Sequence, residues 1–271
     1  MKKIIITGAS SGLGEALAKE YAKQGWSVCV ADIQQEAGEA LAKKLSADHG
    51  TDCFFYSLDV TSEDQWQALY NEVAQRWKGL DALINNAGVA SSGDIDDLPL
   101  SDFQWTVDVN LMGVVKGCYF FTPLLKKQGG YIVNVASMAG LLHVPGMSAY
   151  NVSKAAVVAL SETLCAELES YGIKVSVLCP AFFQTNLTKN MRATHQGGIK
   201  VANRLMEKSS ISAADIAAKV YKESLAGKFH ILTHTRENMF WRLKRFLPKI
   251  YMMQIKRTGK KMHKKMTEKT A

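Results

Sequence analysis

Tyr150 and Lys154 are the residues whose types and spacing most directly indicate chemistry in this chain. Side chains four positions apart lie on one face of a helix, so the phenol would stand beside an ammonium group. Tyrosine has an ordinary pKa of about 10, and a nearby cation lowers that pKa because it favours the phenolate. The pair could therefore donate or accept a proton near neutral pH. The spacing alone is weak, because tyrosine and lysine are both common on helix surfaces.

A glycine-rich turn near the N-terminus predicts a phosphate-binding loop. The apolar run at 2–7 is typical of a buried parallel strand, and a helical pattern follows the turn at 15–24. Glycines allow close approach of the backbone, and a helix N-terminus offers free N–H groups to a pyrophosphate. The alternative is an ordinary strand-to-helix turn. The candidate cofactor contacts here are Gly8, Ser10, Ser11, Gly12, Leu13 and Gly14.

Asp32 ends the second predicted strand, at 27–32. An acidic residue at this place can bond the hydroxyls of an adenosine ribose and repels a 2′-phosphate. It therefore favours NAD(H), with NADP(H) left open. The alternative is a solvated acid that caps the next helix, at 34–45.

Taken together and in chain order, these pieces resemble the short-chain dehydrogenase/reductase family in its compact single-domain form. The motifs that carry the resemblance are Thr7-Gly8-x-x-x-Gly12-x-Gly14, Asp59-Val60, Asn85-Asn86-Ala87-Gly88, Asn110, Ser137, Tyr150-x-x-x-Lys154, and Pro180 with Thr185. They span roughly residues 1–235. One departure is Pro180-Ala181, where the family often has Pro-Gly.

The resemblance implies a role for each matched position. Tyr150 would be the acid/base, and Lys154 would hold the nicotinamide ribose and depress the pKa of Tyr150. Ser137 would orient the substrate oxygen, and Asn110 would anchor a water that links Lys154 to solvent. The cofactor itself carries the hydride. Further cofactor contacts are implied for Asp59, Val60, Asn86, Ala87, Gly88, Pro180, Phe183 and Thr185, besides Tyr150 and Lys154.

Alternating strand-like and helical stretches predict an α/β fold. We expect a Rossmann-like, doubly wound parallel sheet of about seven strands with helices on both faces. The strands are predicted near 2–7, 27–32, 52–57, 81–85, 130–136, 173–179 and 229–233, and long helices near 102–127 and 148–171. Residues 1–235 would form one dinucleotide-binding catalytic domain, with 181–210 as its substrate-binding segment. Residues 236–271 would form a basic, amphipathic, helical extension.

The composition points to a reducing compartment and a protein that does not span a membrane. The chain has 271 residues and five scattered cysteines without a Cys-x-x-Cys pair, which read as buried thiols. The histidines lack ligand spacing, so no metal site is expected. The first strand leaves no room for a signal peptide, and no run of about twenty apolar residues occurs. The predicted location is cytoplasmic.

The net charge of +8 is concentrated in the tail. Residues 236–271 hold eight Lys, four Arg and two Glu, a balance of +10, so the remainder carries −2. Apolar residues recur there at helical spacing, and Pro248 should interrupt the helix. The tail would contact an anionic membrane surface peripherally, or pack on the protein itself or a partner subunit. Nucleic acid is not an expected partner, because no recognisable module accompanies the charge.

The expected substrate is a small apolar alcohol or ketone. The segments 89–94 and 141–147, which the resemblance places at the substrate, are mostly apolar. The sequence thus predicts an NAD(P)-dependent alcohol dehydrogenase or carbonyl reductase, assembled as a homodimer or homotetramer through the two long helices. The alternatives are a non-catalytic dinucleotide-binding sensor and a membrane-associated scaffold.

Overall fold

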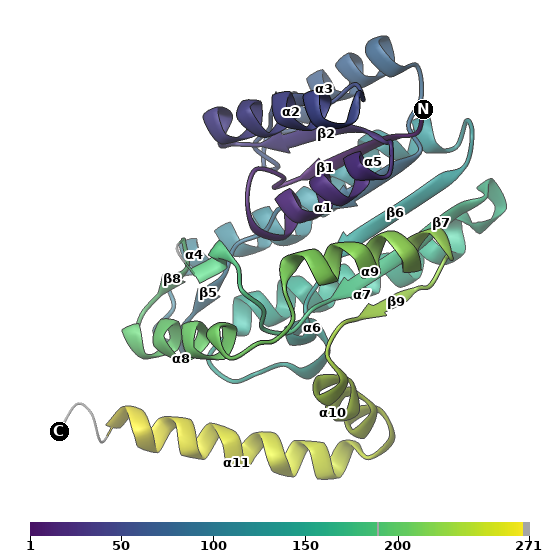
Figure 1. The fold of residues 1–271 in the computed structure, drawn as a ribbon. Helices are drawn as coiled ribbons and strands as arrows, with labels where there is room; N and C mark the ends of the chain where they lie inside the picture. The colour runs from purple at the N-terminus through teal and green to yellow at the C-terminus, as the bar shows by residue number, and fades with distance from the viewer. Residues whose placement is uncertain (189, 268–271) are drawn as a thin grey trace.

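Seven parallel strands form one sheet in the order β3-β2-β1-β4-β6-β7-β9 (Figure 1). The structure is a computed structural model that describes residues 1–188 and 190–267. The strands are β1 (Lys3–Thr7), β2 (Ser27–Asp32), β3 (Phe54–Ser57), β4 (Ala82–Asn85), β6 (Gly130–Val135), β7 (Ile173–Cys179) and β9 (His230–Leu232). The chain runs outward from β1 to β3 and then crosses to β4, so the strand order reverses between β1 and β4. Such a switch point is where ligands bind in open α/β sheets. The predicted Rossmann-like fold is confirmed.

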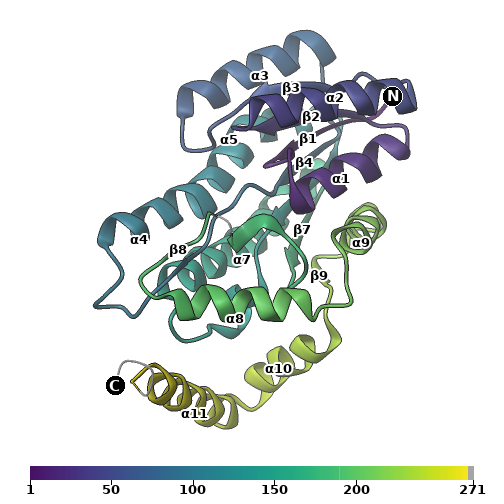
Figure 2. The same ribbon diagram turned by 60° about the vertical axis from the view of Figure 1, so that its left-hand side comes forward.

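Helices cover both faces of this sheet (Figures 1 and 2). The helices α1 (Gly12–Lys23), α2 (Gln35–His49) and α9 (Ala213–Leu225) lie on one face, and α3 (Glu63–Trp77), α5 (Gly113–Leu125) and α7 (Ser148–Leu168) lie on the other. Alternate residues of a strand point to opposite faces. Ile4 and Ile6 of β1 accordingly join the core beneath α1, whereas Ile5 joins the opposite core. A strand buried on both sides must be apolar at every position, which explains the continuous isoleucine run.

The two long helices differ in detail from the prediction. The predicted helix at 102–127 is divided into α4 (Leu100–Val107), a π-helical turn (Asp108–Met112) and α5. The one predicted at 148–171 ends as α7 at Leu168 and continues as a single 3₁₀ turn to Tyr171. Gly172 stops it with a φ of +66°, a conformation that glycine adopts without strain.

Short elements on the substrate side complete the domain. They are β5 (Ser91–Ser92), paired with β8 (Arg192–Ala193), together with α6 (Met138–Leu142), the 3₁₀ turn Asn186–Thr188 and α8 (Gln196–Glu207). The small β5–β8 sheet was not predicted, because two-residue strands leave no periodic signal. It ties the loop after β4 to the segment that follows β7.

The basic tail forms two helices, α10 (Thr235–Phe246) and α11 (Pro248–Thr267). Pro248 interrupts the helix as predicted, and it occupies the first position of α11, where its missing N–H costs nothing. In both views the tail lies on the side of α8, away from β1 and β2 (Figures 1 and 2). None of the helices in the described ranges combines the length and apolar character needed to cross a bilayer.

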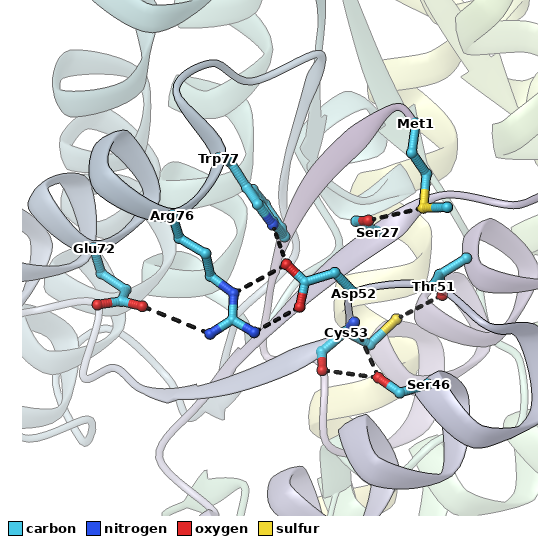
Figure 3. A network of polar contacts seen from close by, with 9 residues as sticks. All are labelled: Met1, Ser27, Ser46, Thr51, Asp52, Cys53, Glu72, Arg76 and Trp77. Atoms are coloured by element: carbon cyan, nitrogen blue, oxygen red, sulfur yellow. Dashed lines mark hydrogen bonds and ion pairs between the residues drawn. The ribbon is translucent and has the colours of Figure 1, made fainter.

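A polar network fastens the β3 edge of the sheet (Figure 3). Arg76 donates from Nη2 and Nε to the two carboxylate oxygens of Asp52, at 2.6 and 3.0 Å. Trp77 donates from Nε1 to the same carboxylate at 2.8 Å. These hydrogen bonds, with Arg76 foremost, hold the pKa of Asp52 below its ordinary value. The network joins the end of α3 to the segment entering β3, far along the sheet from the switch point.

Candidate active site

The glycine loop follows β1 and wraps closely around the chain after β4. Gly8 has a φ of +62°, and a Cβ placed on it would lie 2.8 Å from Ala87 Cα. A Cβ on Gly14 would lie 2.0 Å from the Gly8 carbonyl oxygen. Both positions therefore require glycine for backbone contact. Ser11, the N-cap of α1, makes no side-chain capping bond, which leaves the first N–H groups of α1 available to an anion.

Thr7 and Asn86 lock this loop to the end of β4. Thr7 Oγ1 accepts hydrogen bonds from the backbone N–H groups of Asn86 and Ala87, each at 3.0 Å. The Asn86 amide donates in return to the carbonyl oxygens of Thr7 and Gly8, at 2.8 and 3.1 Å. Asn86 and Ala87 are therefore brought against the glycine loop. The share of Thr7 in this lock was not predicted.

Asp32 lies at the end of β2 and is only 5% exposed. Its Oδ2 accepts from Ser10 N–H at 2.9 Å, and its Oδ1 accepts from Gln34 N–H at 3.0 Å. The carboxylate is thus fixed against the glycine loop. The alternative reading of Asp32 as a solvated acid is wrong, since the residue is buried. Ser10 is also buried, and the Leu13 side chain belongs to the core beneath α1.

Asp59 and Val60 follow β3 on the same side of the sheet. Asp59 is exposed, and its Oδ1 accepts from the Thr61 N–H and hydroxyl at 2.9 and 2.8 Å. Val60 is buried against α5, where a Cβ on Gly113 would lie 2.9 Å from Val60 Cγ2. The pair forms a hydrogen-bonded turn at the carboxyl end of β3.

Asn110 lies in the π-helical turn and is completely buried. Its Oδ1 accepts from Val89 N–H at 2.8 Å, and its Nδ2 donates to the Val89 carbonyl at 2.9 Å and to Ser153 Oγ at 3.2 Å. The widened π turn is the local distortion that accommodates this residue, and such turns occur often at functional sites. Asn110 therefore joins the loop after β4 to α7, the helix of Tyr150.

Ser137 stands between β6 and α6 as the N-cap of that helix. Its Oγ accepts from Ala139 N–H at 3.1 Å and donates to the Pro180 carbonyl at 3.4 Å. Met138 N–H donates to the same carbonyl at 2.9 Å. The end of β6 is thereby tied to the turn after β7, which fixes the direction of the Ser137 hydroxyl.

Tyr150 lies in the first turn of α7 and is 8% exposed. Burial raises the pKa of its phenol, and the neighbouring Ser137 hydroxyl partly offsets that rise. The predicted lowering of this pKa by Lys154 is therefore not found. The reason is geometric, because the Lys154 ammonium lies 6.0 Å from the centre of the Tyr150 ring and is bonded elsewhere.

Lys154 lies one helical turn beyond Tyr150 and is 4% exposed. Its Nζ donates to the Val135 carbonyl at 2.8 Å. A Cβ on Gly88 would lie 3.1 Å from Asn110 Oδ1 and 3.4 Å from Lys154 Nζ, so the three groups adjoin. Burial lowers the pKa of Lys154 to about 8, because a desolvated ammonium is costly. A lysine with such a pKa can exchange a proton near neutral pH.

The segment after β7 carries Pro180, Phe183 and Thr185. The Phe183 side chain is buried in the core beneath α1, whereas Thr185 is half-buried before the 3₁₀ turn. His234, which was not predicted, holds this segment: its Nε2 donates to the Phe182 carbonyl at 3.0 Å, and its Nδ1 accepts from Ala181 N–H at 3.3 Å. The turn in which alanine replaces the expected glycine is thus fixed by the N-cap residue of α10.

These residues meet where the carboxyl ends of β1, β2, β4, β6 and β7 converge. The tight glycine loop, the free N–H groups of α1 and the Asp32 carboxylate fit the pyrophosphate and ribose of a dinucleotide. Two hydroxyls, of Ser137 and Tyr150, and the Lys154 ammonium suit proton exchange with a substrate oxygen. No cluster of three or more metal-ligating side chains occurs within the described ranges.

Comparison with known proteins agrees with this geometry. Residues 2–196 match the family model described as short chain dehydrogenase. The chain belongs to that family. It is 32% identical over 256 residues to the CLA biosynthesis dehydrogenase/reductase of Lactiplantibacillus plantarum, across 88% of this chain and 89% of that one. It is also 32% identical over 196 residues to the trans-4-hydroxycyclohexanecarboxylate dehydrogenase of Sinomonas cyclohexanicum, across 70% of this chain and 76% of that protein.

A solved structure gives the same picture for the fold. A short chain dehydrogenase/reductase from Burkholderia phymatum in complex with NAD matches with a TM-score of 0.87 and 32% identity, across 92% of this chain and 94% of that one. The resemblance predicted from the motifs is therefore confirmed. The protein is an oxidoreductase of the short-chain dehydrogenase family.

Proposed function

We propose that the protein uses NAD(H) to interconvert apolar secondary alcohols and ketones, or lipid-like alcohols and aldehydes. The observation that carries this proposal is the group of Ser137, Tyr150 and Lys154 at the carboxyl ends of the strands, the same edge of the sheet at which the glycine loop lies. Two of these three side chains are less than a tenth exposed. Burying an ammonium and a phenol lowers the stability of the fold. Their presence in one protein with a dinucleotide-binding loop is explained by proton and hydride transfer.

In the proposed reaction the nicotinamide supplies or accepts the hydride. Tyr150 donates its phenolic proton to the carbonyl oxygen during reduction and takes it back from the hydroxyl during oxidation. Its raised pKa keeps the phenol protonated at neutral pH, which favours the donor role. Ser137 holds the same oxygen, and Lys154, with its pKa of about 8, passes the replacement proton to Tyr150. Asn110 positions α7 against the loop after β4.

Asp32 supports a preference for NAD(H). Its carboxylate is buried and fixed beside Ser10, where a 2′-phosphate would bring a second negative charge close to it. The Burkholderia phymatum relative is described with NAD bound, which agrees with this preference.

Apolar residues around α6 support the substrate class. Leu141 is buried, and Leu142, Val144 and Met147 are half-buried next to the Ser137–Tyr150 pair. We assign substrate contacts to this stretch and to the segment 181–210, within the catalytic unit 1–235. The named Sinomonas relative oxidises a ring alcohol by its description, which agrees with an alcohol substrate. His143 is exposed, so its ring is not assigned a substrate role.

A homodimer completes the proposal. Val107, Leu111, Val115 and Tyr119 recur every four residues along α4, the π turn and α5, and each remains half-buried or exposed. Leu160 and Leu164 repeat that spacing on α7. Partners such as Val114 and Val157 pack on the sheet instead. Leu111, Leu160 and Leu164 also pack in part against the core, and the area of the stripe that stays exposed suits burial against a second copy. Light scattering at micromolar concentration should give at least twice the chain mass.

The cysteines fit a cytoplasmic location. All five are free, and four are buried. Burial raises the pKa of Cys118 and of Cys179 to about 12, so these thiols stay protonated and unreactive.

A chain-length series of ketones with NADH tests the proposal. We expect consumption of NADH to become faster from 2-butanone to 2-decanone, and to be slower with NADPH at every length. Turnover should be lost in Tyr150→Phe, for which Tyr171→Phe is the matched control, because Tyr171 is exposed in the 3₁₀ turn after α7. Binding of NADH without turnover of any alcohol, aldehyde or ketone would favour the sensor alternative. A rate that falls with chain length would contradict the apolar substrate.

A further inference from the structure

The tail concentrates exposed apolar side chains at the corner between α10 and α11. Among the described residues, 17 large hydrophobic side chains are exposed, and seven of them lie between positions 239 and 253. They are Met239, Phe240, Phe246, Leu247, Ile250, Met252 and Met253. Phe246 alone is 75% exposed. We call these seven residues the apolar corner. A cluster of this kind on a protein surface indicates contact with another body.

Exposed cations lie along the same two helices as the apolar corner. The exposed basic residues of the tail with described side chains are Arg236, Arg242, Arg245, Lys249, Lys256, Arg257, Lys260 and Lys261. Within the described residues none of them forms an ion pair with a carboxylate. Glu237 is the one acidic residue of α10 and α11. The positive field of the tail is therefore directed to solvent.

The inner side of the tail is already covered by the protein. Lys244 donates from Nζ to the Leu141 carbonyl at 2.6 Å, and it lies 3.0 Å from His143 Nδ1. The Trp241 ring lies 5.0 Å from the His230 ring, and Tyr251 is 7% exposed. Self-packing therefore accounts for this inner side. It leaves the apolar corner and the cations without a partner.

These contacts place the tail against the substrate side of the enzyme. Leu141 lies in α6, the helix that begins directly after Ser137, and His143 follows it. A Cβ on Gly259 of α11 would lie 3.9 Å from Pro145 Cγ, in the stretch that leads to Tyr150. Figure 1 shows α10 next to α6, and in both views α10 and α11 lie on the side away from β1 and β2 (Figures 1 and 2). Whatever binds the outer tail surface therefore lies near the approach to the active site.

We propose that the outer face of α10 and α11 docks on the surface of an anionic lipid bilayer. The apolar corner enters the interface between headgroups and acyl chains, and the exposed cations of the same helices pair with lipid phosphates. An apolar alcohol dissolved in the bilayer then reaches Ser137 and Tyr150 over a short path. This last step rests on the proposed function, whereas the docking does not.

Charge complementarity favours lipid over a second copy of the chain. A symmetric contact through this face would bring two sets of like charges together. Nucleic acid would satisfy the cations but would leave Phe246, Leu247 and Ile250 exposed to water. An anionic bilayer satisfies both features at once.

Sedimentation with vesicles tests the docking. The full-length protein should pellet with vesicles of phosphatidylcholine and phosphatidylglycerol in equal parts, and should stay in solution with phosphatidylcholine alone. Binding should weaken as salt shortens the Debye length from about 30 Å at 0.01 M to about 8 Å at 0.15 M. Two variants test the two features of the surface separately. Phe246→Ser with Ile250→Ser reduces the apolar corner, and a fourfold charge variant reduces the cations. The charge variant carries Lys256→Gln, Arg257→Gln, Lys260→Gln and Lys261→Gln.

We expect each variant to bind the anionic vesicles at least tenfold more weakly than the unmodified chain. A matched control removes four exposed charges elsewhere: Lys23→Gln, Lys43→Gln, Lys44→Gln and Lys127→Gln. This control should bind as the unmodified chain does. All three variants should keep turnover of a water-soluble ketone, because none of these residues belongs to the catalytic group. Loss of turnover with normal vesicle binding in the unmodified chain would count against the proposed function alone.

Several outcomes would overturn the docking. They are full-length protein that stays in the supernatant at low salt, equal binding to phosphatidylcholine alone, and a control that weakens as much as the charge variant. A lower mass of the apolar-corner variant by light scattering would show instead that the corner joins two copies. Vesicle binding abolished by equimolar duplex DNA, with the DNA retained, would favour a nucleic-acid partner.

Discussion

The strand ends and the tail differ in the burial of charged and aromatic side chains: they are buried at the strand ends, and most of them are exposed in the tail. At the strand ends Lys154 is 4% exposed and bonded to a carbonyl, and Tyr150 is 8% exposed. In the tail, all the described lysines and arginines except Lys244 face solvent, and phenylalanines and methionines are exposed on the same helices. Polar groups are buried where a reaction would need them fixed and desolvated. Apolar groups are exposed where the proposed partner is a lipid surface.

The free-energy cost of holding a cation in the folded protein differs between the two regions. A lysine with a pKa lowered from 10.5 to about 8 is held in a folded state that disfavours its charge. The polar atoms around it are bonded to the loop after β4, to β6 and to α7, so contacts from several parts of the fold offset the free-energy cost of burying the ammonium. The cations of α11 are exposed, so they carry no such desolvation cost, and their positions do not rely on contacts with a distant strand. Changes at the strand ends should therefore have large effects on turnover, and changes in the tail should leave turnover intact.

The largest effect is expected from Lys154→Met. Removal of the ammonium takes away the proton carrier behind Tyr150 and the group that would hold the ribose. We expect turnover to fall by about 100-fold to 10,000-fold, the usual share of acid–base catalysis. Steady-state rates with NADH measure this. The matched control is Lys116→Met, because Lys116 also donates to a carbonyl, that of Thr61 at 2.8 Å, but lies on α5. Equal losses in both variants would show that the effect is structural.

The next effect concerns the choice of cofactor at Asp32. Asp32→Asn keeps an oxygen that can accept from Ser10 N–H and removes the negative charge. Two like charges at short range cost about 1–4 kcal/mol, so NADPH affinity should rise by roughly tenfold to several-hundredfold. Titration of the protein with NADPH and NADH by fluorescence measures both affinities. Asp48→Asn removes a charge from an exposed site on α2 and should change neither affinity. Tighter binding of NADPH than NADH by the unmodified chain would contradict the role of Asp32.

A smaller effect is expected from a pair of glycine variants. Gly8 and Gly25 both have positive φ, of +62° and +78°, so alanine costs about 1–2 kcal/mol of backbone strain at either position. A Cβ on Gly8 also meets Ala87, whereas nothing lies within 4 Å of a Cβ on Gly25. Gly8→Ala should therefore lower NADH affinity by at least about tenfold, and Gly25→Ala should leave it unchanged. Urea unfolding beside NADH titration separates strain from binding, and equal affinities in the two variants would contradict the loop assignment.

The smallest effect is expected at the β3 edge, where Asp52 meets Arg76 (Figure 3). The folded-state pKa of Asp52 is lowered, so its carboxylate stabilises the fold above its unfolded pKa of about 3.9, and this contribution is lost as pH falls through the folded pKa. Both side chains are about two-fifths exposed, so Asp52→Asn should cost only about 0.3–1 kcal/mol at pH 6. The difference from the unmodified chain should shrink below pH 4. Urea unfolding at several pH values measures it, and a constant difference would contradict the titration.

Much of the fold and of the site follows from local sequence. The isoleucines of β1, the adjoining glycines and the Tyr-x-x-x-Lys spacing are continuous in the chain, so period and turn chemistry identify them. The contact of His234 with Ala181 joins positions 53 apart, and the contact of Lys244 with Leu141 joins positions 103 apart. No local pattern encodes such contacts. The π turn around Asn110 and the raised pKa of Tyr150 depend on tertiary packing, which explains why an intact helix and a lowered pKa were expected instead.

The acid/base role of Tyr150 is the central claim, and one variant tests it most directly. Tyr150→Phe keeps the aromatic ring and removes the hydroxyl that would exchange the proton. Ketone reduction should fall by at least about 100-fold, while NADH binding, titrated on the same sample, should stay within about threefold of the unmodified chain. Retention of more than about a tenth of the original turnover, with NADH bound normally, would contradict the claim.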